Sequence, residues 1–301
     1  LDIFVANYIE CPLDTPAPCT RLGVPVYCDP STWNMYEPQQ ASLYFNNGDG
    51  TFRDVSVESG IAQFRGRGMG VTSTDYDNDG DMDIYVANDV TENFLYQNQG
   101  DGTFLETALL SGTAYDLHGH EQGSMGCDFG DYDGDGWFDL IVTSYQNQPN
   151  TLYHNLRDGT FEDATIPSRV IVGSMENVTW ATFFFDYDND SRMDLFIAYG
   201  HLQDNIEKIE PQTKYLWPNQ LFRNNGDGTF TDVSAQAGPG FQVRRTTRGG
   251  AFGDLDNDGD LDIVLSNSRE GPTVLENVLR NGRHWINIQL EGVKSNRDGI
   301  G

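Results

Sequence analysis

The chain has 301 residues and a formal net charge of −28, with 46 acidic residues against 18 Lys and Arg. This charge excludes nucleic acids and anionic membrane surfaces as favoured partners, because phosphates would be repelled. It contains no run of about 18 apolar residues, so the sequence shows no membrane span. No secretion signal is visible, and the opening residues match the middle of a repeat, so we expect that any signal would lie upstream.

The first seven residues correspond to the second half of a unit that recurs later. Residues 1–7 repeat the pattern of residues 82–88, so Asp2 takes the place of Asp83. A proline-rich segment follows and carries three of the four cysteines. We expect a disulfide there, preferably Cys19 with Cys28, in an oxidising compartment; reduced, buried thiols are the alternative. The connectivity of Cys11, Cys19, Cys28 and Cys127 stays open, and Cys127 is expected in the core of an inner strand.

Each repeat predicts four short strands. A Gly-rich strand such as 68–74 or 123–129 enters an Asp-rich loop, and a β-branched strand such as 83–88 leaves it. A third strand and a fourth strand beginning Thr-Phe are joined by an Asp-Gly turn, which is a strong hairpin signal. These turns are Asp49-Gly50, Asp101-Gly102, Asp158-Gly159 and Asp227-Gly228. Four antiparallel strands per repeat predict an all-β protein, a β-propeller built of four-stranded blades.

The Asp-rich loops have a common spacing that predicts calcium binding. Asp occupies the first, third, fifth and ninth positions of a nine-residue run, and Ca²⁺ prefers six to eight oxygen ligands on such a tightly curled loop. Position seven is expected to offer its backbone carbonyl, and position six is Gly except in the third loop, where Ser191 makes weak binding the expectation. The expected ligands are Asp75, Asp77, Asp79, Asp81 and Asp83; Asp131, Asp133, Asp135, Trp137 and Asp139; Asp186, Asp188, Asp190, Arg192 and Asp194; Asp254, Asp256, Asp258, Asp260 and Asp262; and Asp2 in a partial fifth loop.

The sequence of these loops allows two other interpretations. An EF-hand would need Glu at position twelve, where this chain has Val86, Val142, Ile197 and Leu265. Ordinary Asp-Gly surface turns are the simpler alternative, since these residues dominate turns. Four loops in one phase, each crowding carboxylates that repel one another without a cation, favour about four Ca²⁺ ions, with a fifth at Asp2. Four ions would reduce the net charge from −28 to −20.

The first aspartates of the loops recur at intervals of 56, 55 and 68 residues, the expected blade length. The Asp loops and Asp-Gly turns share one edge of the blades. The connections at the opposite edge vary in length, and we expect a partner site there; mere tolerance of insertions is the alternative. This variable edge comprises residues 8–40, 63–67, 115–122, 201–218 and 242–247.

The repeated block of residues 46–56 and 224–234 resembles the FG-GAP or VCBS-type calcium-binding propellers. Residues 284–290, followed by 295–301, are similar to the opening of an ASPIC/UnbV module, and together the two resemblances point to the cartilage acidic protein family. They imply a secreted or cell-surface propeller, commonly seven-bladed when complete, with adhesion or matrix roles. The expected organisation is a propeller at residues 1–277 and a truncated ASPIC/UnbV-like module at residues 278–301.

Candidate catalytic groups are sparse, so we expect no enzyme. His118 and His120 flank a Gly and lack the helical spacing of a zinc site. The sequence contains no nucleophile elbow, phosphate-binding loop or redox CxxC. Paired Asp carboxylates serve glycan hydrolysis elsewhere, but bound Ca²⁺ would keep them ionised. Five arginines precede inner strands and are expected either to select an acidic ligand or to pair with neighbouring carboxylates: Arg65, Arg67, Arg244, Arg245 and Arg248.

The function expected from the sequence is a non-catalytic, extracellular calcium-binding propeller that binds or adheres to a protein or an acidic glycan through its variable edge. A structural subunit of a cell-surface or extracellular assembly is the alternative, with self-assembly of the chain included. An enzyme acting on polysaccharide ranks last.

Overall fold

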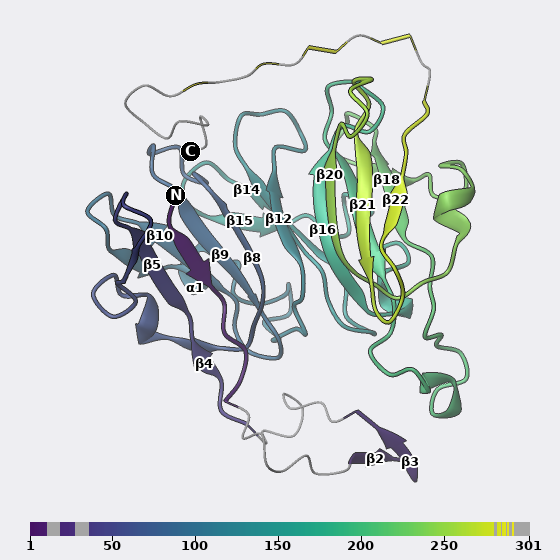
Figure 1. Cartoon of the computed structure of the whole chain (residues 1–301), viewed down its shortest axis with the longest axis horizontal. Helices are drawn as coiled ribbons and strands as arrows, with labels where there is room; N and C mark the ends of the chain where they lie inside the picture. Colours follow the sequence, from purple (N-terminus) through teal and green to yellow (C-terminus); the bar gives the residue numbers. More distant parts are fainter. Residues whose placement is uncertain are drawn as a thin grey trace.

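Small antiparallel sheets stand side by side along an arc, in chain order from the purple to the yellow end in the computed structural model (Figure 1). The structure describes residues 1–10, 19–27 and 36–279, and positions 282, 283, 285, 286, 288 and 291. Three sheets have four strands. These are β8 (Gly68–Thr74), β9 (Asp83–Asn88), β10 (Phe94–Asn98) and β11 (Phe104–Glu106); β12 (Cys127–Gly130), β13 (Asp139–Val142), β14 (Thr151–Asn155) and β15 (Phe161–Asp163); and β16 (Thr179–Phe185), β17 (Asp194–Tyr199), β18 (Gln220–Asn224) and β19 (Phe230–Asp232).

The first and last sheets of the series have three strands. They are β1 (Ile3–Val5), β5 (Ser42–Asn46) and β6 (Phe52–Asp54); and β20 (Thr247–Gly253), β21 (Asp262–Asn267) and β22 (Thr273–Leu275). The chain is therefore an all-β propeller of antiparallel blades, as expected. The described residues form five blades where seven were expected for a complete ring, because repeats of 55 to 68 residues fill 301 residues after about five.

The remaining elements are short. Two two-stranded ladders pair β2 (Cys19–Arg21) with β3 (Val24–Val26) and β4 (Gln39–Gln40) with β7 (Arg65–Gly66). The helical segments are α1 (Ala108–Ser111) and the 3₁₀ turns η1 (Ile61–Gln63), η2 (Ser174–Glu176), η3 (Ile206–Lys208) and η4 (Pro239–Gln242). The sequence pattern did not predict α1, since a single turn is too short to show helical periodicity.

The core lies between neighbouring blades. One cluster joins Ile141 and Leu152 of the third blade to Phe184, Leu195 and Phe222 of the fourth, all of them buried. Each such side chain contributes about 1.5–3 kcal/mol by burial, so blade-to-blade packing is the main source of stability. Cys127 begins β12 and is a free thiol, as expected for a core cysteine, and burial raises its pKa.

Glycines in or just before the inner strands allow adjacent blades to approach closely. A Cβ on Gly70 would lie 2.4 Å from the carbonyl oxygen of Met125, and one on Gly126 would lie 2.1 Å from that of Trp180. Both distances are below any real contact, so these positions require Gly. This explains the Gly-rich character of the entering strands. The strand expected at residues 123–129 begins only at Cys127, because the amides of Met125 and Gly126 both bond to Thr143 instead of continuing the regular ladder.

The β2–β3 hairpin lies below the blades (Figure 1) and contacts the segment that follows β17 in the fourth blade. The backbone N–H of Tyr27 donates to Gln203 at 2.7 Å, and the Gln203 amide donates back to the Tyr27 carbonyl at 2.8 Å. Arg21 forms an ion pair with Glu210 at 2.7 Å. Two segments of the variable edge, residues 8–40 and 201–218, are therefore bound to each other. The expected Cys19–Cys28 disulfide stays a prediction, because Cys11 and Cys28 lie outside the described residues.

Candidate metal centres

Each Asp-rich loop joins the first strand of a blade to the second, and all four loops lie at corresponding ends of their sheets. The ninth aspartate begins the outgoing strand and pairs with the last residue of the incoming one, as Asp83 does with Thr74 and Asp139 with Gly130. The same register recurs for Asp194 in β17 and Asp262 in β21. The blade geometry therefore holds one end of every loop in a fixed position.

The first aspartate of each loop folds the backbone around its own carboxylate. In the first loop, Asp75 accepts the N–H of Asp79 at 3.0 Å and the N–H of Gly80 at 2.9 Å. Corresponding bonds occur in the other three loops, from Asp135 and Gly136 to Asp131, from Asp190 and Ser191 to Asp186, and from Asp258 and Gly259 to Asp254. These bonds give the tight curl that brings alternate side chains together.

The curl requires left-handed backbone at two positions of each loop. Position six has φ of 96° at Gly80 and 65° at Ser191, so the serine of the third loop adopts a conformation that is costly for a residue with a Cβ. Position four is also left-handed, as at Asn78 with φ of 57° and Asn257 with φ of 63°. Asn tolerates this region better than most residues, which explains its presence there.

Three carboxylates converge in every loop. Their oxygens lie within 4.8 Å of one another in the groups Asp75, Asp77 and Asp83; Asp131, Asp133 and Asp135; Asp186, Asp188 and Asp194; and Asp254, Asp256 and Asp258. Two oxygens that share one Ca²⁺ at about 2.3–2.6 Å lie no more than about 5 Å apart, so the groups have the size that the ion needs. Of the aspartates expected at positions one, three, five and nine, Asp79, Asp190 and Asp262 lie outside these groups, and Asp139 converges instead with Asp133 and His154.

The ninth aspartates of the four complete loops are buried, and in the absence of a cation burial raises the pKa of Asp83 and Asp194 to about 7 and also raises that of Asp139. Their oxygens are held by backbone amides. The N–H of position two donates to one oxygen, at 3.2 Å from Tyr76 to Asp83. The N–H of the residue that ends the third strand donates to the other, at 2.8 Å from Asn98 to Asp83. A buried carboxylate in this setting favours a bound cation.

Asparagines at or just after the ends of the third strands are site residues that were not predicted from the sequence. In every blade the backbone N–H of this residue donates to a ninth-position aspartate, and its side chain also bonds within the loop edge. They are Asn46, Asn98, Asn155, Asn224 and Asn277. These asparagines occupy the same position in each repeat, and this regular recurrence is the sequence signal that could have identified them.

Asp2 has the geometry of a ninth position. Its Oδ1 accepts the N–H of Asn46 at 2.8 Å, as Asp83 accepts that of Asn98. The Asn46 amide donates to the carbonyl of Leu1 at 3.1 Å, which matches the bond from Asn98 to Met82. Calcium ligation by Asp2 stays a prediction.

Protein cations occupy two of the loops. In the third, Arg192 pairs with Asp190, and Arg283 pairs with Asp188 and lies 3.8 Å from Asp190. In the second, Arg157 donates to Asp135 at 2.8 Å. His154 Nδ1 lies 3.0 Å from Asp139 and 3.6 Å from Asp133, a histidine contact that the sequence did not predict. The carboxylates of the first and fourth loops form no ion pair with a Lys, Arg or His in the described part of the chain.

The variable edge uses most of its arginines internally. Arg245 pairs with Glu270, Arg65 donates to the carbonyl of Pro38 at 3.3 Å, and Arg67 donates to that of Val90 at 3.5 Å. Arg248 stacks on Trp180 with its guanidinium carbon 3.9 Å from the ring centre, and Arg244 lies 5.7 Å from that of Trp217. Arg245 therefore follows the ion-pair alternative.

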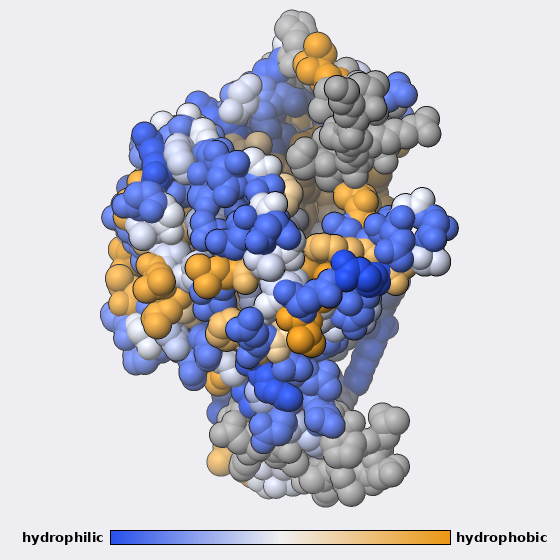
Figure 2. Space-filling view, turned by 90° about the vertical axis from the view of Figure 1, so that its left-hand side faces the viewer, coloured by the Kyte–Doolittle hydropathy of each residue, from blue (hydrophilic) through white to orange (hydrophobic). Residues whose placement is uncertain are grey.

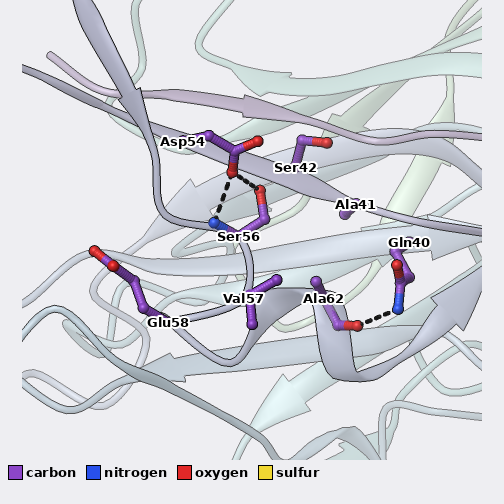
Figure 3. A pocket seen from close by; sticks show the side chains of 8 residues that line it. All are labelled: Gln40, Ala41, Ser42, Asp54, Ser56, Val57, Glu58 and Ala62. Carbon is purple, nitrogen blue, oxygen red and sulfur yellow. Dashed lines mark hydrogen bonds between the residues drawn. The ribbon is translucent and has the colours of Figure 1, made fainter.

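The surface pocket of the first blade does not assemble catalytic groups (Figure 3). Asp54 accepts both the N–H and the hydroxyl of Ser56, and the Gln40 amide donates to the carbonyl of Ala62. Glu58 is paired with Arg53. The principal polar side chains of the pocket are therefore already bonded within the protein.

The histidine pair considered from the sequence forms a surface turn. The backbone amides of His118 and His120 donate to Asp116 at 2.9 and 2.8 Å, and the two rings lie 6.1 Å apart, both exposed. The convergent groups of possible metal ligands in the described residues do not include them. His201 is buried, accepts the N–H of Gln203 at Nδ1, and has its pKa lowered to about 4 by burial.

The surface on the side of the first blades is mostly hydrophilic, with separate hydrophobic patches (Figure 2). The helices that the structure describes are short, and none combines the length and hydrophobicity that crossing a membrane requires.

Comparisons with known proteins agree with this geometry. A sequence profile of the FG-GAP-like repeat matches residues 33–86, 75–142, 131–197 and 213–265, more than half of the chain. The chain is 27% identical to cartilage acidic protein 1 of Homo sapiens over 266 residues and 27% identical to that of Mus musculus over 267 residues. Each match covers 87% of this chain but only 37% and 38% of the relatives, so the chain spans less than two fifths of their length.

Two solved structures show weaker similarity. A lectin of Agrocybe aegerita that recognises non-reducing terminal N-acetylglucosamine is 17% identical with a TM-score of 0.39, covering 81% of this chain and 77% of the lectin. The Photorhabdus luminescens Tc holotoxin pore is 14% identical with a TM-score of 0.35, covering 85% of this chain and 11% of that one. Neither carries an argument about this chain. The repeats and the curated relatives do: the chain belongs to the FG-GAP-like repeat family and is related to cartilage acidic protein 1.

Proposed function

We propose that this chain is a non-catalytic, extracellular binding or adhesion module whose blades are stabilised by calcium ions in the Asp-rich loops. The observation that carries the proposal is the convergence of three carboxylates in each of four loops, at positions one, three and nine in the first and third loops and at positions one, three and five in the second and fourth. In the first and fourth loops no Lys, Arg or His of the described residues neutralises them. A hard divalent cation is the ligand that oxygen-rich loops of this kind favour.

The residues proposed to hold the ions are the aspartates at positions one, three, five and nine, with the position-seven carbonyls of Asp81, Trp137, Arg192 and Asp260. Asp2 is proposed as part of a fifth site. Calcium at extracellular concentration would keep such sites filled, which supports an extracellular location together with the relationship to cartilage acidic protein 1. The partner would be a protein or an acidic glycan at the variable edge.

Metal analysis and thermal unfolding test the proposal. Purified protein should bind about four calcium ions at equilibrium in about 1 mM calcium, and EDTA should lower its Tm, while magnesium should not restore it at equal concentration. Protein that contains no calcium and melts at the same temperature with and without EDTA would refute calcium-linked stability.

A structural subunit is the second candidate, and exposed hydrophobic side chains at both ends of the blade series favour it. Ile3 and Val5 on β1 are 43% and 39% exposed, and Phe252 on β20 and Val274 on β22 are 44% and 59% exposed. Light scattering in calcium separates the two: a monomer favours the binding module, and a defined oligomer favours the assembly.

A further inference from the structure

One asparagine in each of three blades contacts two neighbouring Asp-rich loops at once. The Nδ2 of Asn224 donates to the carbonyl of Met193 in the loop of its own blade at 2.9 Å and to that of Tyr132 in the preceding loop at 2.7 Å. The same two bonds are made by Asn155, to Phe138 at 3.0 Å and to Tyr76 at 2.9 Å, and by Asn277, to Leu261 at 3.4 Å and to Tyr187 at 2.7 Å.

These asparagines also hold the ninth aspartate of their own loop. The backbone N–H of Asn224 donates to Asp194 at 2.8 Å, and that of Asn155 donates to Asp139 at 2.9 Å. One residue therefore fixes a buried carboxylate in one loop and the carbonyl of position two in the preceding loop. Position two lies between the first and third aspartates, so its peptide group must take a fixed orientation when those two side chains coordinate the same ion.

A second set of contacts links the loops through position four. Asn78 Nδ2 donates to the carbonyl of Gly136 at 3.4 Å, which connects the first loop to the second. Asn189 Nδ2 donates to the carbonyl of Gly259 at 3.3 Å and to the Asp260 carboxylate at 2.7 Å, which connects the third loop to the fourth. The four loops thus form one hydrogen-bonded row along the edge of the blades.

The asparagine hydrogen bonds between blades are buried, and we expect them to transmit a conformational change from one Asp-rich loop to the next. Asn155 and Asn224 are each 1% exposed, so an unmade bond at either amide would leave a buried polar group unsatisfied. A loop that adopts its closed form therefore favours the closed form of its neighbour. Two sites that share such an element influence each other's affinity equally in both directions.

We infer that Asn155, Asn224 and Asn277 are positioning residues that couple calcium binding in neighbouring blades, so that the loops bind the ion with positive cooperativity. The inference rests on the proposed calcium function, and it assigns to these asparagines no direct contact with the ion. It also implies that a weak site is assisted by the neighbour to which its asparagine bonds.

The test is a calcium titration of the whole chain by isothermal calorimetry, comparing Asn224→Ala with Asn98→Ala. Asn98 is the matched control, because it makes the same bonds to its own loop, to Asp83 at 2.8 Å and to Met82 at 3.1 Å, and no bond to a preceding loop among the described residues. The native chain should give a Hill coefficient above unity. Asn224→Ala should lower it and weaken the linked pair of sites about fivefold or more, the lower end of usual coupling, whereas Asn98→Ala should leave the Hill coefficient unchanged.

Asn277→Ala serves if Asn224→Ala fails to fold, since Asn277 is only partly buried and links the third loop to the fourth. An unchanged Hill coefficient in the folded variant, or an equal loss in Asn98→Ala, would overturn the coupling and leave the calcium sites intact. A native chain that binds no calcium would instead overturn the proposed function itself.

Discussion

Asp135→Asn is the change that isolates one calcium loop. Asp135 is at position five of the second loop, where its Oδ1 accepts the N–H of Trp137 at 2.8 Å and its carboxylate belongs to the convergent group with Asp131 and Asp133. Asn keeps the size and the acceptor oxygen but removes the charge. The loop can therefore keep its backbone form while it loses affinity for a cation.

The expected loss follows from mass action. A site with a Kd of about 10 µM in about 1 mM calcium contributes about 2.7 kcal/mol to the free energy of unfolding. Unfolding entropy is about 2.1 cal/mol/K per residue, or about 0.6 kcal/mol/K for 301 residues, so loss of one site should lower Tm by about 4 °C.

Differential scanning calorimetry of the variant and the native chain, in calcium and in EDTA, measures this effect. The difference in Tm should be present in calcium and should nearly vanish in EDTA. Trp137→Phe is the control, because position seven offers only its backbone carbonyl and the substitution should change Tm equally in both buffers. A Tm difference for Asp135→Asn that is as large in EDTA as in calcium would refute the reasoning, since the aspartate would then act through the fold alone.

Three further predictions concern other parts of the chain. Arg192→Gln should tighten calcium binding by the third loop up to about fivefold, because the guanidinium competes with the ion for Asp190. This factor corresponds to the free energy of about 1 kcal/mol that a surface ion pair contributes. Unchanged or weaker binding in calorimetry would contradict the prediction. Acidification from pH 6.5 to 4 should destabilise the native chain by up to about 3 kcal/mol relative to the His201→Gln variant. In this window the histidine of the unfolded chain binds a proton, whereas the buried histidine, with its pKa of about 4, does not, so stability rises with pH. Urea unfolding measures both free energies, and parallel pH curves for the two proteins would contradict the prediction. Gln203→Ala should speed hydrogen exchange at residues 19–27, because it removes both hydrogen bonds to Tyr27, and should leave exchange in the Asp-rich loops unchanged. Unchanged exchange in the hairpin would contradict this prediction and show that other contacts hold the hairpin in place.

The blades and the loops could be predicted from the sequence because their signals are local. The strands at 68–74 and 83–88 appear in the structure with those bounds, since the Gly-rich and the β-branched segments and the Asp-rich turn between them fix these bounds over a few positions. The nine-residue spacing of aspartates predicted the convergence that Asp75, Asp77 and Asp83 show. Such features depend on neighbours in the chain and therefore leave a periodic pattern.

The parts that the sequence did not reveal depend on distant partners. Tyr27 meets Gln203 across 176 positions, and nothing in the composition of either segment marks the other. Asn155 repeats in phase with Asn98 and Asn224, yet its bond to Tyr76 of the preceding blade becomes visible only once the blades are packed. His154 joins Asp133 and Asp139 for the same reason, because β14, the third strand of the blade, must first lie beside the loop between β12 and β13.

The most direct test of the account is a crystal structure of the chain grown in millimolar calcium, with anomalous data to identify the ions. The account predicts a calcium ion in each of the four Asp-rich loops, with aspartate and position-seven oxygens at about 2.3–2.6 Å. Loops that hold only water, or that remain closed by arginines such as Arg192 while calcium is present, would contradict it.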